Sequence, residues 1–187
     1  MREKIILAAI DEFSIHGLNF TMDDVAASLG MSKKTIYKFF KSKEDLFLGI
    51  ADYCFTDIKR SEQEVLADPN LDITEKIRNI IIVLPERYRN IGLSNLYKLK
   101  EKEPKVYKKV EKYLQTDWDA TIALLESGMA QGKIKRIKIP ILKAMIESTI
   151  SAFFGSDVLI ENDMSYEQGL NEMIDIIMEG ITVKGEN

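Results

Sequence analysis

An all-helical fold is the class that this sequence predicts, and three observations predict it. The 187 residues contain only four prolines and ten glycines. No segment shows the sustained alternation of β-branched and polar residues that is typical of a half-buried strand. Apolar residues instead recur at the three- and four-residue spacing of amphipathic helices along most of the chain. We therefore expect an N-terminal three-helix unit, joined by a long helix to a second helical unit.

The N-terminal part of the chain predicts three short helices with recognisable ends. The first spans about residues 2–15, and its inner face is formed by Ile5, Ile6, Ala9, Ile10 and Phe13. Thr21 begins a second helix over residues 22–29, because a threonine followed three residues later by an acid is close to a capping box. Ser32 caps a third helix, which runs to about Phe40. A turn of about three residues separates the last two helices, and this is the layout of a helix–turn–helix.

Ser42 and the acids after it begin a long helix, which is expected over residues 43–67 and cannot pass Pro69. We place a domain boundary inside it, with one domain at 1–48 and a second at 49–187. The second domain divides into helical stretches at residues 73–91, 93–101, 104–131, 139–160 and 166–182. Pro85 is expected to kink or divide the first of these stretches.

Positive charge is concentrated in one short segment, although the chain as a whole carries a net charge of −4. Residues 1–50 hold seven basic and seven acidic side chains, and five of those bases lie between Lys33 and Lys43. A run of lysines is often only a solvated helix face. Here it coincides with a helix–turn–helix whose second helix would enter the major groove of DNA. DNA binding needs only such a local footprint, because each neutralised phosphate releases counterions.

Side chains on and beside the third helix suit contact with DNA. Lysines can donate to guanine edges or to phosphate, and a threonine methyl can meet a thymine. Tyr37 can donate its phenol to phosphate, whereas Ile36 and Phe40, four residues apart, should face inward. The candidate DNA-contacting residues are Thr21, Ser32, Lys33, Lys34, Thr35, Tyr37, Lys38, Phe39 and Lys43.

The stretch "ILAAIDEFSIHGLNFTMDDVAASLGMSKKTIYKFFKSKEDLF" resembles the N-terminal domain of the TetR/AcrR family of bacterial transcriptional regulators. The resemblance covers residues 4–50. It implies that the position of Thr21 contacts phosphate at the start of the second helix. It also places Lys33, Thr35 and Lys38 at or near bases, and Tyr37 and Lys43 at phosphates.

Phe39 is the position where the chain departs from that pattern, because many members carry histidine or tyrosine there. A phenylalanine cannot donate a hydrogen bond to phosphate. We therefore expect Phe39 to make an apolar contact with a sugar or a thymine methyl group.

The family resemblance further implies a helical regulatory domain that binds an effector and forms a homodimer. Independent support comes from the last two helical stretches. Residues 166–182 carry an apolar stripe, and residues 139–160 are apolar on more than one face, as in a helix that is buried on both sides. We expect both to build a two-fold dimer interface of four helices. The alternative is that both stripes fill the core of one chain.

An effector pocket would be lined by apolar and aromatic side chains with a few hydroxyls. The candidates are Tyr53, Phe55, Leu84, Tyr88, Leu96, Tyr97, Tyr113, Trp118, Ile122, Met145 and Phe153. The alternative for each of them is an ordinary place in the core. No pattern of charge identifies the effector, so an apolar or aromatic compound is the expected class.

Other classes of function find little in the sequence. The chain has one histidine, His16, and one cysteine, Cys54, so it lacks a zinc ligand set and an intramolecular disulfide. No glycine-rich phosphate loop is present, and we predict neither enzymatic activity nor a cofactor or metal. Asp11 and Glu12 interrupt the first apolar run, which excludes a signal peptide there. No apolar stretch is long enough to span a membrane, so a cytoplasmic protein is expected.

The prediction is thus a homodimeric, sequence-specific transcriptional regulator that recognises a palindromic operator in double-stranded DNA. We expect a repressor that a small-molecule effector releases from its operator. The alternative is a helical protein-binding adaptor without sequence-specific DNA binding, which would not need the lysines aligned with Tyr37.

Overall fold

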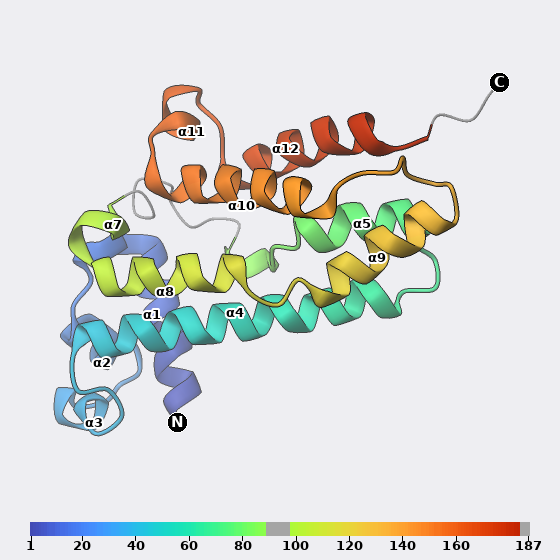
Figure 1. Ribbon diagram of the computed structural model, residues 1–187. Coiled ribbons are helices and arrows are strands. Elements are labelled where there is room, and N and C mark those ends of the chain that lie inside the picture. The colour runs from blue at the N-terminus through green and yellow to red at the C-terminus, as the bar shows by residue number, and fades with distance from the viewer. Residues whose placement is uncertain (89–97, 184–187) are drawn as a thin grey trace.

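The computed structural model describes residues 1–88 and 98–183, and the predicted all-helical fold is confirmed. The N-terminal elements are α1 (Arg2–His16), the 3₁₀ turn η1 (Gly17–Asn19), α2 (Met22–Ser28), α3 (Lys33–Tyr37) and the long α4 (Lys43–Ala67). The first three helices and the start of α4 form a compact head at one end of the molecule (Figure 1).

The rest of the described chain forms a second helical part. Its elements are α5 (Ile73–Ile81), the 3₁₀ turn η2 (Glu86–Tyr88), α7 (Leu99–Lys102), α8 (Pro104–Gln115), α9 (Asp119–Ala130), α10 (Ile139–Gly155), α11 (Val158–Glu161) and α12 (Tyr166–Ile181). In Figure 1, α8 lies alongside α4, and α10 and α12 form a layer on the far side of α8 and α5. We call this second part, residues 49–187, the body.

Four expected helices end three or more residues earlier than predicted. The stretch 104–131 is not one helix, because Asp117 takes up a left-handed conformation with φ 58° between α8 and α9. The helix expected over 73–91 ends at Ile81, ahead of Pro85, as a proline requires. The third helix stops at Tyr37 rather than Phe40, and the stretch 139–160 ends at Gly155 and resumes as α11. Much of the helix expected over 93–101 lies outside the described residues.

Local sequence explains the helix starts that were predicted correctly. Thr21 and Asp24 form a reciprocal capping box, in which the Thr21 N–H donates to Asp24 Oδ2 at 2.7 Å and the Asp24 N–H donates to Thr21 Oγ1 at 3.2 Å. Asp72 with Glu75 and Ser165 with Gln168 form the same motif at α5 and α12. Such caps satisfy backbone donors that a helix start leaves free.

The buried side chains form two clusters, one in the head and one in the body. The head cluster contains the inner faces of α1, α2 and α3, but it also includes Leu99, Val106 and Tyr107 from α7 and α8. The body cluster joins α5 and α9 to α10 and α12 around Ile77, Leu125 and Ile174. The head core therefore continues past residue 48, where the sequence predicts a domain boundary, and α8 contributes side chains to it.

Within the described residues, none of the helices is long and apolar enough to cross a membrane. The same residues include no group of three or more histidine, cysteine or acidic side chains that could hold a metal ion.

Candidate nucleic-acid interface and internal cavity

The inner face of α3 is firmly anchored in the head. Ile36 and Phe40 are fully buried, as the sequence predicts. Phe40, just after α3, packs so closely against α4 that a Cβ atom added at Gly49 would lie 2.8 Å from its Cε1 atom, so a larger residue there would displace the Phe40 ring. The Arg2 guanidinium lies 4.1 Å from the centre of the Phe40 ring and donates to the Phe39 carbonyl at 2.9 Å. These contacts fix the position and direction of a very short helix.

The outer face of α3 presents its side chains to solvent. Lys34, Tyr37 and Lys38 are exposed. In the described part of the chain, neither Lys34 nor Lys38 forms an ion pair, so both ammonium groups are available to an anion. An anchored helix with free cations and a phenol on one side has the chemistry of a helix that reads the major groove.

Three other candidates are engaged within the head. The Lys33 ammonium donates to Asp23 Oδ2 at 2.6 Å, and this hydrogen bond raises the pKa of Lys33. The Ser32 and Thr35 hydroxyls lie 2.9 Å apart, and Ser32 Oγ accepts from the Thr35 N–H. Lys33 can contact DNA only if its ion pair with Asp23 breaks. The cost of breaking that pair reduces the binding free energy that a Lys33–DNA contact would add.

Thr21 and Lys43 both sit beside the loop before α2. The Thr21 hydroxyl donates to Asp24 Oδ2 at 2.9 Å within its capping box. The Lys43 ammonium donates to the Leu18 carbonyl at 2.6 Å and lies over the Phe20 and Phe47 rings, at 4.9 Å and 5.4 Å from their centres. Burial lowers the pKa of Lys43. In this conformation Lys43 supports the end of η1 and does not project into solvent.

Phe39 lies half-buried against the head core, next to the exposed Lys38. Part of its ring is therefore accessible beside the outer face of α3. This position is compatible with the apolar contact that the sequence predicts.

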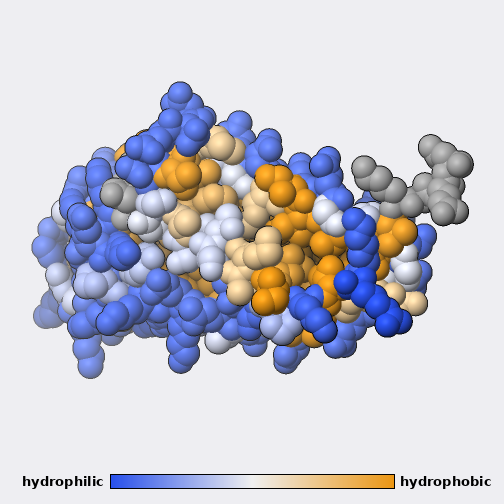
Figure 2. Space-filling model, turned by 45° about the horizontal axis from the view of Figure 1, so that its top comes forward, coloured by the Kyte–Doolittle hydropathy of each residue, from blue (hydrophilic) through white to orange (hydrophobic). Residues whose placement is uncertain are grey.

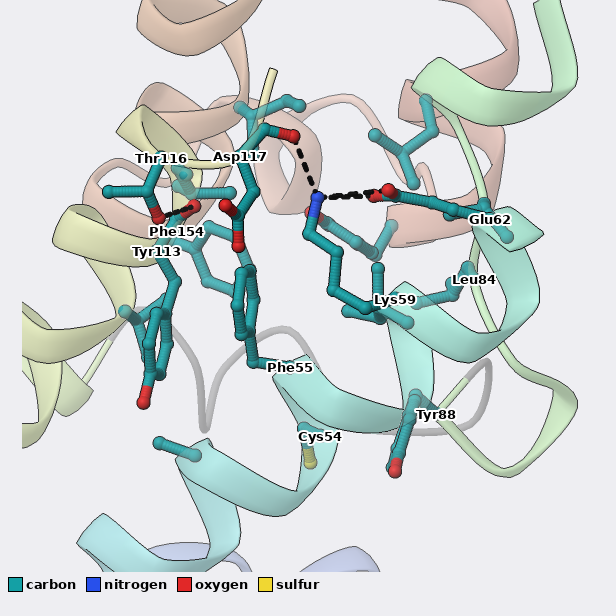
Figure 3. A pocket seen from close by; sticks show the side chains of 18 of the residues that line it. Cys54, Phe55, Lys59, Glu62, Leu84, Tyr88, Tyr113, Thr116, Asp117 and Phe154 are labelled. Atoms are coloured by element: carbon teal, nitrogen blue, oxygen red, sulfur yellow. Dashed lines mark hydrogen bonds and ion pairs between the residues drawn. The ribbon is translucent and has the colours of Figure 1, made fainter. Parts of the chain in front are cut away.

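A cavity of about 280 Å³ lies between the head and the body. Its walls come from α1, α4, α5, α7, α8, α9, α10 and α12 and from the segment after α5. Phe13 and Phe47 of the head core line one end, and Ile146 and Leu170 of the body line another part. Small-molecule pockets commonly have about 300 to 1,000 Å³, so this one suits a small or slender ligand. Figure 3 shows the aromatic and polar side chains that surround it.

Some of the pocket residues predicted from sequence line this cavity and others do not. Lining residues among them are Phe55, Leu84, Tyr88, Tyr113 and Trp118. Leu96 and Tyr97 lie outside the described residues. Tyr53, Ile122, Met145 and Phe153 are not among the lining residues.

These four side chains have other surroundings. The Tyr53 hydroxyl donates to Glu3 at 3.3 Å, and Phe153 packs edge-on against Tyr166. Ile122 lies half-buried on α9, and Met145 is 55% exposed on the outside of α10. Residue type alone predicts these side chains in the pocket, but the side of the helix on which each one lies directs it elsewhere.

One charged group in the cavity wall is not among the residues predicted from sequence. The Lys59 ammonium donates to both carboxylate oxygens of Glu62, each at 2.9 Å, and to the Asp117 carbonyl at 2.9 Å (Figure 3). Burial raises the pKa of Glu62, although the bonds from Lys59 oppose that shift. Lys59 thus ties α4 to the strained residue between α8 and α9. The only sequence signal was the three-residue spacing of the two charges.

A second polar cluster lies beside the cavity on α4. Asp57 is buried, accepts from the Tyr88 hydroxyl at 3.0 Å and is paired with Arg60. Burial raises the pKa of the Cys54 thiol to about 11. Cys54 is therefore a protonated, weakly reactive thiol at neutral pH.

One face of the body exposes large apolar side chains. Ile141 and Met145 on α10 are 63% and 55% exposed, and Ile176 on α12 is 71% exposed. Figure 2 shows apolar residues gathered on the face that α10 and α12 form. The predicted stripe of α12, by contrast, is largely buried in the core of its own chain, where Met173, Ile174 and Ile177 pack.

Comparison with known proteins supports the assignment of the head. Residues 5–50 match the family model described as bacterial regulatory proteins, tetR family. An HTH-type transcriptional regulator of Bacillus subtilis, YvaF, is 24% identical over 186 residues, which cover 100% of this chain and 98% of that protein. The fatty acid metabolism regulator protein of the same organism is 22% identical and covers 95% of this chain and 94% of its own length.

Solved structures share the fold over almost the whole chain. A transcriptional regulator from Cytophaga hutchinsonii superposes with a TM-score of 0.73 at 18% identity, covering 97% of this chain and 98% of its own. The regulator FadR from Bacillus subtilis, in complex with stearoyl-CoA, gives a TM-score of 0.62 at 21% identity and covers 96% of both chains. The helix–turn–helix geometry, the family match and the shared fold agree: residues 5–50 match the tetR family of bacterial regulatory proteins, and the chain as a whole is similar to transcriptional regulators with that type of head.

Proposed function

We propose that the protein is a homodimeric repressor whose head, residues 1–48, binds a palindromic operator and whose body, residues 49–187, binds a small effector. The proposed contact with DNA rests on one observation, the exposed cations on the outer face of α3. Its inner side is fixed by Ile36 and Phe40, while Lys34 and Lys38 stand free on the other side. In this proposal Lys34, Tyr37 and Lys38 make the first contacts, and Lys33 joins them by exchanging Asp23 for DNA.

Thr21, Ser32, Thr35, Phe39 and Lys43 take supporting positions at the DNA surface. Ser32 caps α3 and keeps its first turn aligned. Lys43 holds η1 through Leu18 and thereby positions the start of α2, where Thr21 lies. Phe39 offers an apolar edge to a sugar or a thymine methyl group.

The effector enters the cavity between head and body. Its walls are mostly apolar and aromatic, so an apolar or aromatic compound suits them. The likeness to a regulator crystallised with stearoyl-CoA supports an effector with a substantial apolar part. Because Phe13 and Phe47 belong to both the cavity wall and the head core, a ligand there acts directly on the orientation of the head. Release follows if the effector prefers the conformation that does not fit the operator.

The dimer forms through α10 and α12, within residues 139–160 and 166–182. Exposed Ile141, Met145 and Ile176 support this surface. A two-fold dimer gives two recognition helices, which would meet half-sites about 34 Å apart on the same side of the duplex.

Retention of DNA by the double variant Lys34→Ala/Tyr37→Ala tests the proposal. A pool of random-sequence duplex is passed over immobilised protein at moderate salt, and circular dichroism verifies that the variant is folded. The wild type retains DNA and the variant does not. A protein-binding adaptor would behave identically in both forms, and equal retention would therefore refute the assignment.

A further inference from the structure

We propose that the effector is an uncharged molecule with an apolar body and a hydrogen-bonding group that pairs with the Thr121 hydroxyl. This inference rests on the proposed function, in which the cavity is the effector site, and it adds the chemical class of the ligand.

The charged pair in the wall is already complete. An ammonium group has three N–H donors, and Lys59 directs its hydrogen bonds at three acceptors, the two Glu62 oxygens and the Asp117 carbonyl. Glu62 is buried and receives both bonds from the same lysine. An anionic ligand would have to displace Glu62 from Lys59 and leave a buried carboxylate unpaired, which is strongly unfavourable.

Most neutral polar groups of the wall are satisfied as well. The Tyr88 and Tyr113 hydroxyls donate to Asp57 and Asp52. The Trp118 indole N–H donates to the Leu114 carbonyl at 3.0 Å, and the Thr116 hydroxyl donates to the Tyr113 carbonyl at 3.2 Å. None of these groups needs a ligand.

Two hydroxyls remain, those of Thr121 on α9 and Tyr166 on α12. Both residues line the cavity, and Thr121 is only 7% exposed. Over residues 1–88 and 98–183, no side chain or backbone group forms a hydrogen bond with either hydroxyl. Burial alone raises the pKa of the Tyr166 phenol. A hydroxyl in the cavity wall that has no protein partner is free to pair with a ligand, and a hydroxyl, carbonyl or amide group of the ligand would supply that partner.

A neutral hydroxyl both donates and accepts, so it discriminates little between such groups but favours them over a purely apolar end. Two acids of the described chain line the cavity, Glu62 and Asp117. Glu62 is paired with Lys59, whereas the exposed Asp117 side chain forms no ion pair with any described residue. A cationic ligand would use this carboxylate, and the experiment therefore includes a cation.

The test compares three probes that share one apolar chain: 1-octanol, octanoate and octyltrimethylammonium. Binding to the full-length protein is measured by the shift of the thermal unfolding midpoint and by calorimetric titration. We expect 1-octanol to bind most tightly. Tighter binding of octanoate or of octyltrimethylammonium overturns the uncharged class, and so does the failure of 1-octanol to bind.

Thr121→Val tests the named hydroxyl at almost constant volume. Because that hydroxyl has no partner in the described protein, its removal leaves the stability of the free protein unchanged or slightly higher. It should weaken 1-octanol about fivefold, as expected for one lost hydrogen bond, and leave 1-chlorooctane unaffected. Thr56→Val, at a hydroxyl that donates to the Asp52 carbonyl outside the cavity, is the matched control and should change neither affinity. Equal losses for both probes in Thr121→Val would overturn the assignment of Thr121.

Failure of the proposed ligand class can be distinguished from failure of the proposed DNA-binding function. DNA retention by the unliganded protein depends on Lys34 and Tyr37 and not on Thr121. If DNA is retained and the uncharged probe fails, the ligand class is wrong and the regulator assignment stands. If DNA is not retained, the proposed function fails whatever the probes do.

Discussion

Tyr113 of α8 stacks flat against Phe55 of α4, with ring centres 4.1 Å apart and ring planes 5° apart. The Tyr113 hydroxyl also donates to Asp52, one turn earlier on α4, and Lys109 pairs with the same carboxylate at 2.6 Å. Both rings line the cavity. The stack therefore connects the helix that carries the head to α8, at the point where an effector would bind.

Replacing Tyr113 separates the two parts of this contact. Tyr113→Phe keeps the stack and loses the hydrogen bond, and should reduce the free energy of unfolding by about 1 kcal/mol. Tyr113→Ala loses both contacts and should reduce it by about 2 kcal/mol. Urea unfolding at neutral pH measures both values. Equal losses in the two variants would mean that the stack contributes nothing.

Lys59 should be important for stability because its partner is buried. Lys59→Met leaves Glu62 without its cation, and a loss of about 2 kcal/mol is expected after allowing for partial solvent access to the pair. Lys105→Met, which breaks the exposed pair between Lys105 and Glu44, is the matched control and should change stability little. Urea midpoints compare the two.

The Lys59→Met defect should shrink in acid. Burial raises the pKa of Glu62, so its protonated form is favoured in the folded chain and the cost of burying its charge appears as pH rises through that pKa. Lowering the pH from 7 towards 5 should therefore recover part of the loss. A defect of constant size over this range would indicate that Glu62 is not the cause.

Two carboxylates at helix starts, Asp24 and Asp72, should make the wild-type protein less stable as the pH falls. The bonds from Thr21 to Asp24, and those from Thr74 and Glu75 to Asp72, lower the pKa of each acid. A lowered pKa gives stability that is complete above about pH 4 and is lost as pH falls through the folded value.

Asp72→Asn should therefore be less stable than the wild type at pH 7, and the difference should narrow below about pH 4. Glu126→Gln, at an exposed acid that forms no hydrogen bond in the described chain, is the control. Thermal unfolding from pH 7 to pH 3 makes the comparison. A gap that persists unchanged into acid would show that the cap does not depend on its charge.

Lys34→Ala should weaken DNA binding without regard to sequence if it meets phosphate, and should reduce the slope of log affinity against log salt by about 0.9. Lys108→Ala removes an exposed lysine of α8 and is expected to leave the slope unchanged. Fluorescence anisotropy over a salt series measures both. The proposed contact would be excluded if the two variants had the same slope as the wild type.

Met145→Asp and Ile141→Asp should each convert the dimer to a monomer, because a charge would be buried in the centre of the α10 surface. Ile15→Asp places the same charge at an equally exposed isoleucine of α1, 72% accessible, and should leave the dimer intact. Sedimentation equilibrium distinguishes the two states. Dimers of unchanged affinity in the α10 variants would rule out this surface.

Much of the head could be predicted from sequence because its signals are local. Caps at Thr21, Ser32 and Ser42, together with inward-facing Ile36 and Phe40, define the helices without knowledge of the rest of the chain. The body is different. The break at Asp117 depends on a left-handed residue that is not glycine and on the distant Lys59, so helical spacing across 104–131 predicts one helix where there are two.

The cavity residues show the same limit. Phe55, Tyr88 and Tyr113 were predicted by residue type and do line the cavity, whereas Met145 has a suitable type but faces outward. Thr121 carries no sequence signal, because only the arrangement of its neighbours leaves its hydroxyl unpaired. Likewise, the Lys33–Asp23 and Lys43–Leu18 contacts join residues from different elements and follow from packing alone.

Selection of bound sequences from random double-stranded DNA by the full-length protein tests the central claim most directly. The account predicts enrichment of a palindromic motif whose half-sites lie about one helical turn apart, and loss of that enrichment in the Lys34→Ala/Tyr37→Ala variant. A pool without any enriched motif, or the same motif selected by the variant, would contradict it.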